Sequence, residues 1–319
     1  MNKIKFKWRL GSSPSGITGV HCMKPSKCPF YNQCWDVEPN ETFLTEKYLN
    51  RKQKKKLVSK GVFTLSNIPN DAELTREQWE NIHAFPKCDS NKLKKFTNSW
   101  STSSQYHFVH FDYIKPAIPI YENTSPYQKI YFQISVLSKL SNGDEIVHRK
   151  FLNPPGIDPR INIIETLLKY TAGEGKIFIY DIKERSPILG EEDVYPTIEM
   201  LKSLQNEYPV YFSEIADALN RIINLAEPFE KRWYYNPLQK GDISWDTISK
   251  TFLGDLDPTL FPYGSEEIAK SNYKRFSQLT SRDQILTIRT LPSYGLMNAY
   301  ALVNIADTFF IESGLRKAA

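Results

Sequence analysis

The feature that most constrains this chain is a change of residue pattern near position 106. Three short segments rich in β-branched and aromatic residues follow it, at 107–112, 130–136 and 145–151. Segments of this kind predict β-strands. Asn142 and Gly143, between the last two, are typical of a tight hairpin turn. We therefore expect an antiparallel sheet to begin here.

The pattern after the third strand adds a helix and another strand. Residues 159–170 carry apolar side chains at helical spacing, and 176–181 form a short apolar run. Further helices are expected at 197–204, 213–225, 244–252, 266–279 and 294–311. Antiparallel strands, a crossover helix, a fourth strand and then helices predict an α/β fold of the ribonuclease-H-like kind, a mixed sheet with flanking helices.

The first 100 residues differ from the rest in charge. They carry 18 Lys+Arg and 9 Asp+Glu, a net charge of +9, whereas the remaining 219 residues have a net charge of −4. All four cysteines also lie in this part, and strand alternation is weak there. We expect a loop-rich, basic, Cys-containing connector over 1–97 and a second domain over 106–319. The polar stretch 98–105 between them predicts a linker.

The sequence gives no sign of a membrane protein. No stretch approaches the ~20 apolar residues that a spanning helix needs, and the basic start leads into no apolar signal segment. We expect a cytoplasmic protein with no membrane partner, whose cysteines serve as thiols or metal ligands rather than in disulfides.

Three motifs are distinctive enough to suggest a family: His-Phe-Asp-Tyr-Ile-Lys-Pro-Ala-Ile-Pro at 110–119, Ser-Pro-Tyr-Gln-Lys-Ile-Tyr-Phe-Gln at 125–133 and Tyr-Tyr-Asn-Pro-Leu-Gln-Lys-Gly at 234–241. With them the chain resembles an uncharacterised bacterial family of DEDD-type 3′–5′ exonuclease-like domains. Such a domain usually follows a RecB-like nuclease domain, so the resemblance implies the C-terminal half of a longer nuclease. Motifs at 19–22, 28–35 and 61–69 resemble the connecting region of the same family.

The resemblance also implies where the catalytic acids would stand, and most of them are replaced. The matching positions hold His110 and Asp112 in the first motif, Arg185 in the second, Asn298 in the third, and Asn224 at a further acidic position. Glu184 could replace Arg185 after a shift of one residue. Tyr294, which in the family orients the attacking water, is retained.

Two-metal hydrolysis needs several carboxylates to hold divalent ions ~3.5–4 Å apart. Leaving the further position Asn224 aside, three of the four metal-ligand positions, those of His110, Arg185 and Asn298, are not acidic. We therefore expect a pseudo-nuclease that binds nucleic acid or a nuclease partner protein and has no certain cofactor. One alternative is an active exonuclease that holds Mg²⁺ or Mn²⁺ at Asp112 with rearranged ligands such as Asp181 and Glu184. This enzyme requires at least three carboxylates converging near Asp112. The other is a degenerating fragment without a selected role.

The cysteines leave two interpretations open. Cys22, Cys28 and Cys34 are separated by five residues each, unlike the closer pairs of structural zinc sites. The resemblance implies the downstream ligands of an iron–sulfur cluster, with a zinc remnant as the alternative metal site. A fourth ligand would be Cys88, His21 or His83. The other interpretation is reduced cysteines left as relics or buried in packing.

A dense basic block is the candidate nucleic-acid-binding surface. Seven cations lie within fourteen residues: Lys47, Arg51, Lys52, Lys54, Lys55, Lys56 and Lys60. Such a block raises the local potential and attracts phosphate. A solvated helix face is the alternative, and base stacking has little support because Tyr48 is the only aromatic residue within the block.

Overall fold

The computed structural model describes residues 49–62, 64, 67–76, 78–79, 87–141, 145–185, 193–239, 241–253 and 266–315. The chain divides into two compact units, one of residues 1–86 with 236–242 and a larger one of residues 87–235 with 243–319. In the described part of the chain, no helix is long and apolar enough to cross a membrane.

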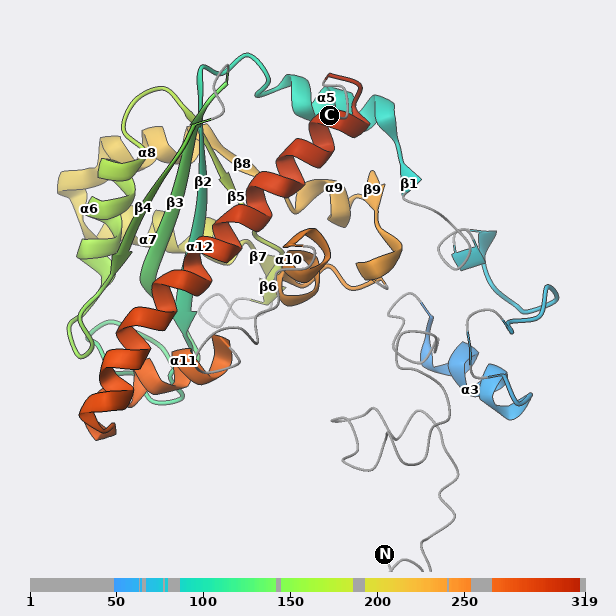
Figure 1. The fold of residues 1–319 in the computed structure, drawn as a ribbon, viewed down its shortest axis with the longest axis horizontal. Coiled ribbons are helices and arrows are strands. Elements are labelled where there is room, and N and C mark those ends of the chain that lie inside the picture. Colours follow the sequence, from blue (N-terminus) through green and yellow to red (C-terminus); the bar gives the residue numbers. More distant parts are fainter. Residues whose placement is uncertain are drawn as a thin grey trace, which may run out of the picture. The chain divides into compact units, whose positions relative to one another are not determined.

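The larger unit is built on a five-stranded mixed sheet (Figure 1). Its strands are, in spatial order, β4 (Ile146–Leu152), β3 (Ile130–Leu140), β2 (Gln105–Ile114), β5 (Lys176–Ile179) and β8 (Ile222–Asn224). The first three pair antiparallel, and β5 and β8 continue the sheet in parallel. Two small ladders join β1 (Lys87–Cys88) to β9 (Tyr234–Tyr235) and β6 (Glu184–Arg185) to β7 (Asp193–Val194).

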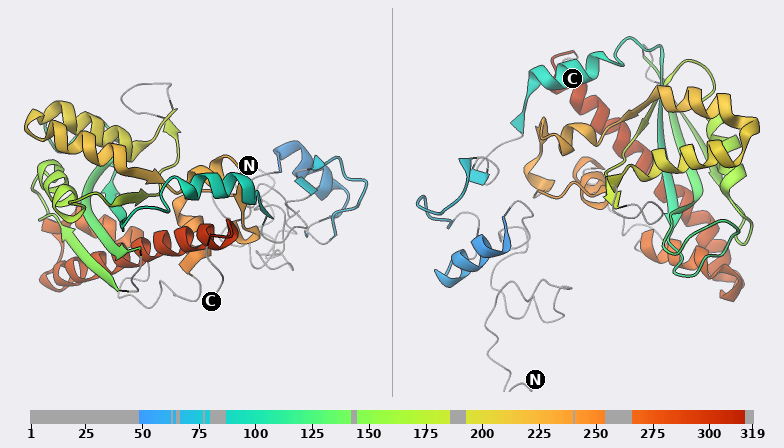
Figure 2. Two further views of the ribbon diagram at one scale, coloured as in Figure 1. Left: turned by 90° about the horizontal axis from the view of Figure 1, so that it is seen from above. Right: turned by 180° about the vertical axis from the view of Figure 1, so that it is seen from behind.

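Helices cover both faces of this sheet (Figure 2). One face packs against α6 (Arg160–Tyr170), α7 (Pro196–Glu207) and α8 (Phe212–Arg221). The opposite face packs against α12 (Ser281–Glu312), α11 (Glu266–Lys274), α10 (Trp245–Leu253) and α5 (Ser90–Asn98). Short helical turns occur at Pro209–Tyr211, Glu227–Glu230 and Phe276–Gln278. The sheet therefore separates two apolar cores.

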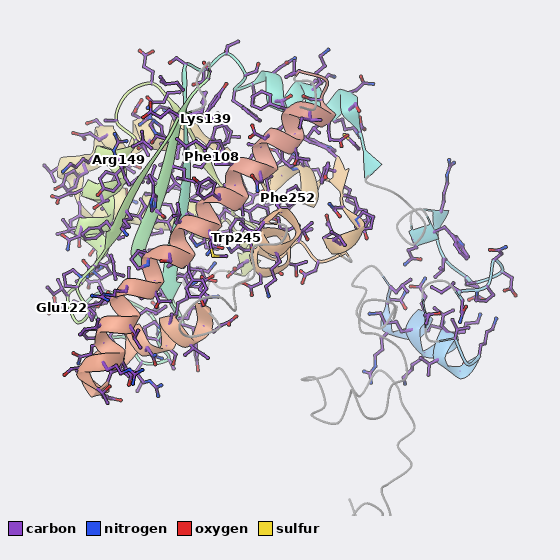
Figure 3. All side chains as sticks on the ribbon, viewed as in Figure 1. Phe108, Glu122, Lys139, Arg149, Trp245 and Phe252 are labelled. Carbon is purple, nitrogen blue, oxygen red and sulfur yellow. The ribbon has the colours of Figure 1, made fainter. Side chains whose placement is uncertain are left out.

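Alternation along β2 decides which side chains face which core. Val109 and Phe111 join the core on the α6, α7 and α8 side, whereas Phe108 stacks on Phe178 in the core beneath α12 (Figure 3). Side chains at every second position of a strand share a face. His110 and Asp112 therefore point toward α10, α11 and α12.

A β-bulge lies beside Asp112. Asp112 pairs with Gln133 and Tyr113 with Tyr131, so Phe132 is the extra residue of β3. A bulge changes which face the following residues point to. Both Phe132, which stacks on Tyr273 of α11, and Gln133, which bonds to α12, face the same side.

Most expected elements are confirmed, and several differ in their bounds. The helix expected over 266–279 ends at Lys274, and the strand expected over 176–181 ends at Ile179. The helix expected to 225 ends at Arg221 and is followed by β8, because Ile222, Ile223 and Asn224 pair with β5. The helix expected from 294 begins at Ser281 and continues through Pro292. The hairpin turn at Asn142 and Gly143 lies outside the described residues.

The boundary between the units also differs from the expected one. Residues 98–105, expected as a linker, lie within the larger unit, and Trp100 is fully buried there against Phe178. Phe96 of α5 packs edge-on against Phe309 of α12. These aromatic contacts attach α5 to the core of the larger unit.

In the smaller unit, α3 (Arg51–Ser59) begins with a capping box. Asn50 accepts a hydrogen bond from the Gln53 backbone N–H, and the Gln53 side chain accepts one from the Asn50 backbone, both at 3.0 Å. These bonds satisfy two donors that would otherwise be unpaired at the helix start.

Candidate functional site

Asp112 is fully buried at the centre of the candidate site. Gln133, opposite it on β3, donates a hydrogen bond from Nε2 to Asp112 Oδ2 at 2.6 Å and a second one to the Leu291 carbonyl of α12 at 2.9 Å. His110 Nε2 lies 3.3 Å from Asp112 Oδ1. The His-x-Asp spacing of β2 thus brings both side chains to one place.

Helix α11 contributes a carboxylate and a lysine that the sequence analysis missed. Lys270 Nζ lies 2.9 Å from Asp112 Oδ1 and 2.5 Å from Glu266 Oε1. Its ammonium group therefore bridges two carboxylates from different elements. Glu266 and Lys270 are four residues apart on α11, a spacing that in sequence indicates only a surface ion pair.

The charges in this cluster shift one another's ionisation. Burial opposes ionisation of Asp112, but the charge of Lys270 and the neighbouring His110 imidazole hold the pKa of the carboxyl far below its usual range. Burial raises the pKa of Glu266, with Lys270 opposing and Asp112 adding to the rise. Burial alone would lower the pKa of Lys270, yet Asp112 and Glu266 raise it above its ordinary value. Lys270 therefore stays protonated between them.

Asn298 of α12 completes the cluster. Its Nδ2 donates a hydrogen bond to Glu266 Oε2 at 3.0 Å. Tyr294, one turn earlier, is buried in an apolar cluster with Phe132 and Leu291, and burial raises the pKa of its hydroxyl. The structure thus brings together His110, Asp112 and Asn298 and adds Glu266, Lys270 and Gln133. We call these six residues the Asp112 cluster.

The donor atoms of His110, Asp112 and Glu266 lie within 4.8 Å of one another. This separation would suit a metal ion, but the Lys270 ammonium already bonds to both carboxylates of the group. An ammonium supplies a positive charge and hydrogen-bond donors, and it has no lone pair with which to join a coordination shell. The residues present therefore do not fit a metal centre while Lys270 occupies this position.

Asp181 follows β5, and its carboxylate binds backbone N–H groups at the start of α7. It accepts hydrogen bonds from the Thr197 and Ile198 N–H groups at the start of α7, at 2.9 and 3.4 Å. Asn224 of β8 binds the backbone of Asp181, accepting from its N–H at 2.9 Å and donating to its carbonyl at 2.6 Å. Burial raises the pKa of Asp181 to about 6, although Lys129 and the two N–H groups oppose this.

Glu184 pairs with two lysines. Its carboxylate lies 2.8 Å from Lys129 Nζ and 3.3 Å from Lys115 Nζ. Burial raises the pKa of Glu184, but the two lysines lower it by more, so the pKa lies below its ordinary value. Arg185 lies beside it in β6, and its side chain is outside the described part of the chain.

One cavity of about 190 Å³ connects these groups. His110, Lys129, Asp181, Glu184 and Lys270 line it together with Trp245 of α10. The Trp245 ring stacks on the His110 ring, with a centroid distance of 5.3 Å and an angle of 26°. The cavity thus has an aromatic wall and carries charges of both signs. No single sequence motif joins α10 and α11 to β2, so the sequence did not indicate this cavity.

The other predicted sites contribute no residue to the lining of this cavity or fall outside the described residues. Cys22, Cys28, Cys34, His21, His83 and Lys47 fall outside the described part of the chain. Cys88 is a free thiol, half-buried, and burial raises its pKa. On α3, Lys54 is buried, while Arg51, Lys52, Lys55, Lys56 and Lys60 are exposed, and Lys56 pairs with Glu73.

Of the comparisons with known proteins, one returned a match, and it covers part of the chain. A search of curated proteins and a search of solved structures both returned no match. A family model matches residues 107–244, from the third residue of β2 to the residue before α10, and so includes His110, Asp112, Asp181 and Asn224. This segment of the chain matches the family described as a domain of unknown function (DUF2779).

Proposed function

We propose that this chain is a catalytically inactive protein with a ribonuclease-H-like fold of the DEDD exonuclease type, which acts by binding nucleic acid or a nuclease partner. The strand order supports the fold: the antiparallel strands β4, β3 and β2 are followed across the sheet by β5 and β8 in parallel. His110 and Asp112, which the resemblance matches to the first catalytic motif, are members of the Asp112 cluster.

The position of Lys270 is the observation that carries the proposal. Two-metal hydrolysis uses divalent ions that stay open to the phosphate and to the attacking water. In this chain an ammonium group fixed to the same chain forms ion pairs with both Asp112 and Glu266. Such a group occupies the two carboxylates without offering a coordination position to a substrate.

The two further acids that the active alternative names, Asp181 and Glu184, are engaged in other contacts. Asp181 bonds to the first N–H groups of α7, and Glu184 pairs with Lys115 and Lys129. The active alternative requires both of these carboxylates to turn toward Asp112. In the structure they line the same cavity as His110 and Lys270. Such a rearrangement would leave Lys129 and the start of α7 without their anionic partners.

Metal binding and cleavage measured together test the proposal. We expect calorimetry with Mn²⁺ and Mg²⁺ to show no binding that depends on Asp112, and labelled single-stranded DNA and RNA to remain intact. Asp112→Asn is the matched control, since it keeps the shape of the side chain and removes its charge. Metal-dependent trimming that this substitution abolishes would overturn the proposal in favour of an active exonuclease.

A further inference from the structure

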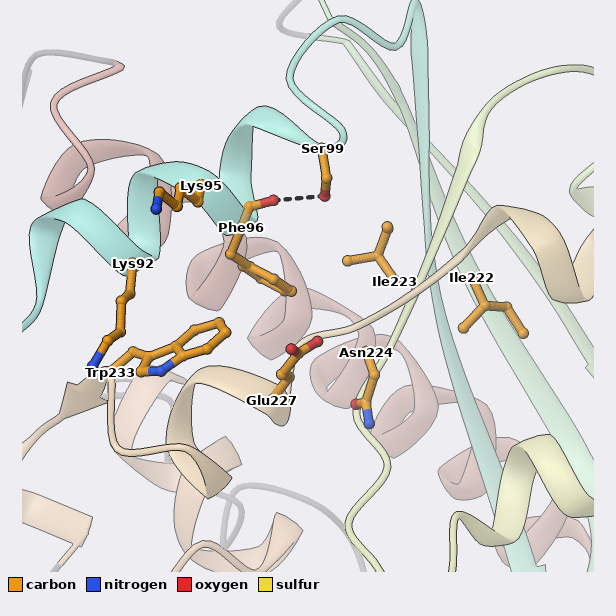
Figure 4. Close-up of a pocket in the computed structure, with 9 residues that line it drawn as sticks. All are labelled: Lys92, Lys95, Phe96, Ser99, Ile222, Ile223, Asn224, Glu227 and Trp233. Atoms are coloured by element: carbon orange, nitrogen blue, oxygen red, sulfur yellow. Dashed lines mark hydrogen bonds between the residues drawn. The ribbon is translucent and has the colours of Figure 1, made fainter.

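A groove on the larger unit lies beside the free edge of the sheet (Figure 4). Its volume is about 410 Å³, and α5 and β8 supply opposite sides. Three consecutive residues of β8, Ile222, Ile223 and Asn224, all line it. Because side chains alternate between the two faces of a sheet, a cavity that touches three consecutive residues runs along the strand edge.

The backbone of β8 presents hydrogen-bonding groups along this edge. The Leu225 N–H donates to the Ile179 carbonyl of β5 at 2.8 Å, so the N–H and C=O groups of Leu225 and Ile223 face β5. Backbone groups of alternate residues point to opposite sides of a strand. The Ile222 carbonyl and the Asn224 N–H and carbonyl therefore point away from β5. Strand β8 is the last strand of this sheet in the described part of the chain.

The side of the groove formed by α5 is basic. Lys92 and Lys95 are exposed and line the groove, one turn apart on the helix. Glu227 also lines it, but Lys231 is already paired with this carboxylate. Lys92 Nζ lies 3.2 Å from Asp89 Oδ2. Three lysines (Lys92, Lys95 and Lys231) against two carboxylates (Asp89 and Glu227) leave this rim a net charge of +1. The apolar part of the groove lining is formed by Phe96 and Trp233. Their rings meet edge to face, with a centroid distance of 6.3 Å.

We propose that this groove binds an extended acidic peptide segment of a partner protein, which adds a strand to the edge of β8. The backbone of the segment would bond to the Ile222 and Asn224 groups, as in β-strand addition. Its carboxylates would face Lys92 and Lys95, and an apolar side chain would contact Phe96 and Trp233. Opposite charges across such a rim give specificity.

The ring contacts of Trp233 favour a peptide over a nucleic-acid strand. The Lys231 ammonium already lies over the Trp233 ring, 4.8 Å from its centroid, and Phe96 packs against the same indole. A stacked base needs a free aromatic face. The backbone edge of β8, by contrast, matches the repeat of another peptide strand. The groove shares no residue with the Asp112 cluster, so this inference can fail without affecting the proposed function.

A random peptide library displayed on phage tests the proposal on the full chain. We expect the selected peptides to be enriched in acidic residues beside an apolar one. In fluorescence anisotropy, the double variant Lys92→Glu/Lys95→Glu should weaken binding of a selected peptide about tenfold. The double variant Lys94→Glu/Lys169→Glu, with the same change of charge on exposed lysines outside the groove, should leave binding unchanged.

Backbone methylation of the selected peptide tests strand addition directly. N-methyl groups on one set of alternate residues should abolish binding, and N-methyl groups on the other set should be tolerated, because only one set faces β8. Equal effects of the two sets would overturn the proposal. It is also overturned if a labelled single-stranded oligonucleotide binds in place of the peptides and loses affinity in the Lys92→Glu/Lys95→Glu variant.

Discussion

At the scale of single residues, Lys270 determines how the Asp112 cluster is held together. A buried ion pair contributes little net stability compared with apolar packing, but loss of one partner leaves an uncompensated charge. Lys270 bonds to two carboxylates at once, from β2 and from its own helix. Loss of this lysine would therefore leave two carboxylates without their shared cation at once.

Lys270→Met is expected to lower the free energy of unfolding by about 3 kcal/mol, because Asp112 and Glu266 lose their shared cation. Urea denaturation measures this, with Lys274→Met as the control on an exposed lysine of the same helix. Added Mn²⁺ should raise the unfolding midpoint of Lys270→Met and leave that of the parent chain unchanged. An equal loss of unfolding free energy in Lys270→Met and Lys274→Met would contradict the bridging role of Lys270.

Asp181 is expected to make stability depend on pH between about 4 and 6. Its folded pKa of about 6 lies above the unfolded value of 3.8, so its contribution is fully present below the unfolded pKa. The contribution is lost as pH rises through the folded pKa. Asp181→Asn keeps an oxygen for the Thr197 N–H and should flatten the pH profile of the unfolding free energy in this window. If the unfolding free energy has the same slope against pH in the parent chain and in Asp181→Asn, Asp181 does not titrate between about pH 4 and 6.

At the scale of elements, the approach of α12 to β3 fixes the position of Gln133. Gly295 lies where the helix crosses the strand, and a Cβ atom there would come within 2.6 Å of Gln133 Nε2 and 3.2 Å of Ser135 Cβ. No side chain fits this space without displacing the amide that bonds to Asp112. The site thus depends on the absence of a side chain on a helix that lies far from β2 in the sequence.

Gly295→Ala is expected to destabilise the chain by about 2 kcal/mol through overpacking, despite the better helix propensity of alanine. Thermal unfolding shows whether Gly295→Ala lowers the melting temperature. Ser293→Ala, two residues earlier on α12, is the control. A higher melting temperature for Gly295→Ala would show that β3 can move aside without cost.

The sequence was sufficient to predict elements with a regular pattern of their own. The strands β2, β3, β4 and β5 and the helix α6 show clear local periodicity, and the structure confirms them. Strand β8 has three residues and exists because β5 is available to pair with it. The continuation of α12 through Pro292 depends likewise on the packing of Leu291 and Tyr294 against Phe132.

The same reasoning applies to the candidate site. His110 and Asp112 were predicted because they are two residues apart on one strand, and Asn298 because it matches a family motif. Glu266 and Lys270 could not be predicted, since their meeting with Asp112 depends on how α11 packs near β2. Asp181 was expected as a metal ligand in the active alternative, and its bonds to the start of α7 depend on tertiary structure.

At the scale of the whole molecule, charge is divided between the two units. The smaller unit carries 15 Lys+Arg and 9 Asp+Glu, a net charge of +6, and the larger unit carries 26 and 27, a net charge of −1. Phosphate backbones are attracted by clustered cations. If the chain binds nucleic acid, the smaller unit is expected to supply most of the ionic contacts.

The salt dependence of oligonucleotide binding tests this division. Arg51→Gln/Lys55→Gln on α3 should reduce the slope of log affinity against log salt by about 1.4, or about 0.7 for each lost phosphate contact with a single strand. Arg149→Gln/Lys150→Gln on β4 removes the same two charge types from exposed positions of the larger unit and should leave the slope unchanged. A smaller slope in the β4 variant and an unchanged slope in the α3 variant would assign nucleic-acid binding to the larger unit.

The bridging ammonium of Lys270 has a consequence for the conditions under which the chain folds. A bound ion can be diluted, captured by a chelator or exchanged for a competing ion, whereas a lysine is present at a local concentration set by the chain itself. Asp112 and Glu266 gain their shared cation as soon as α11 packs beside β2. This cation is encoded in the sequence and does not vary with the supply of divalent ions in the surroundings.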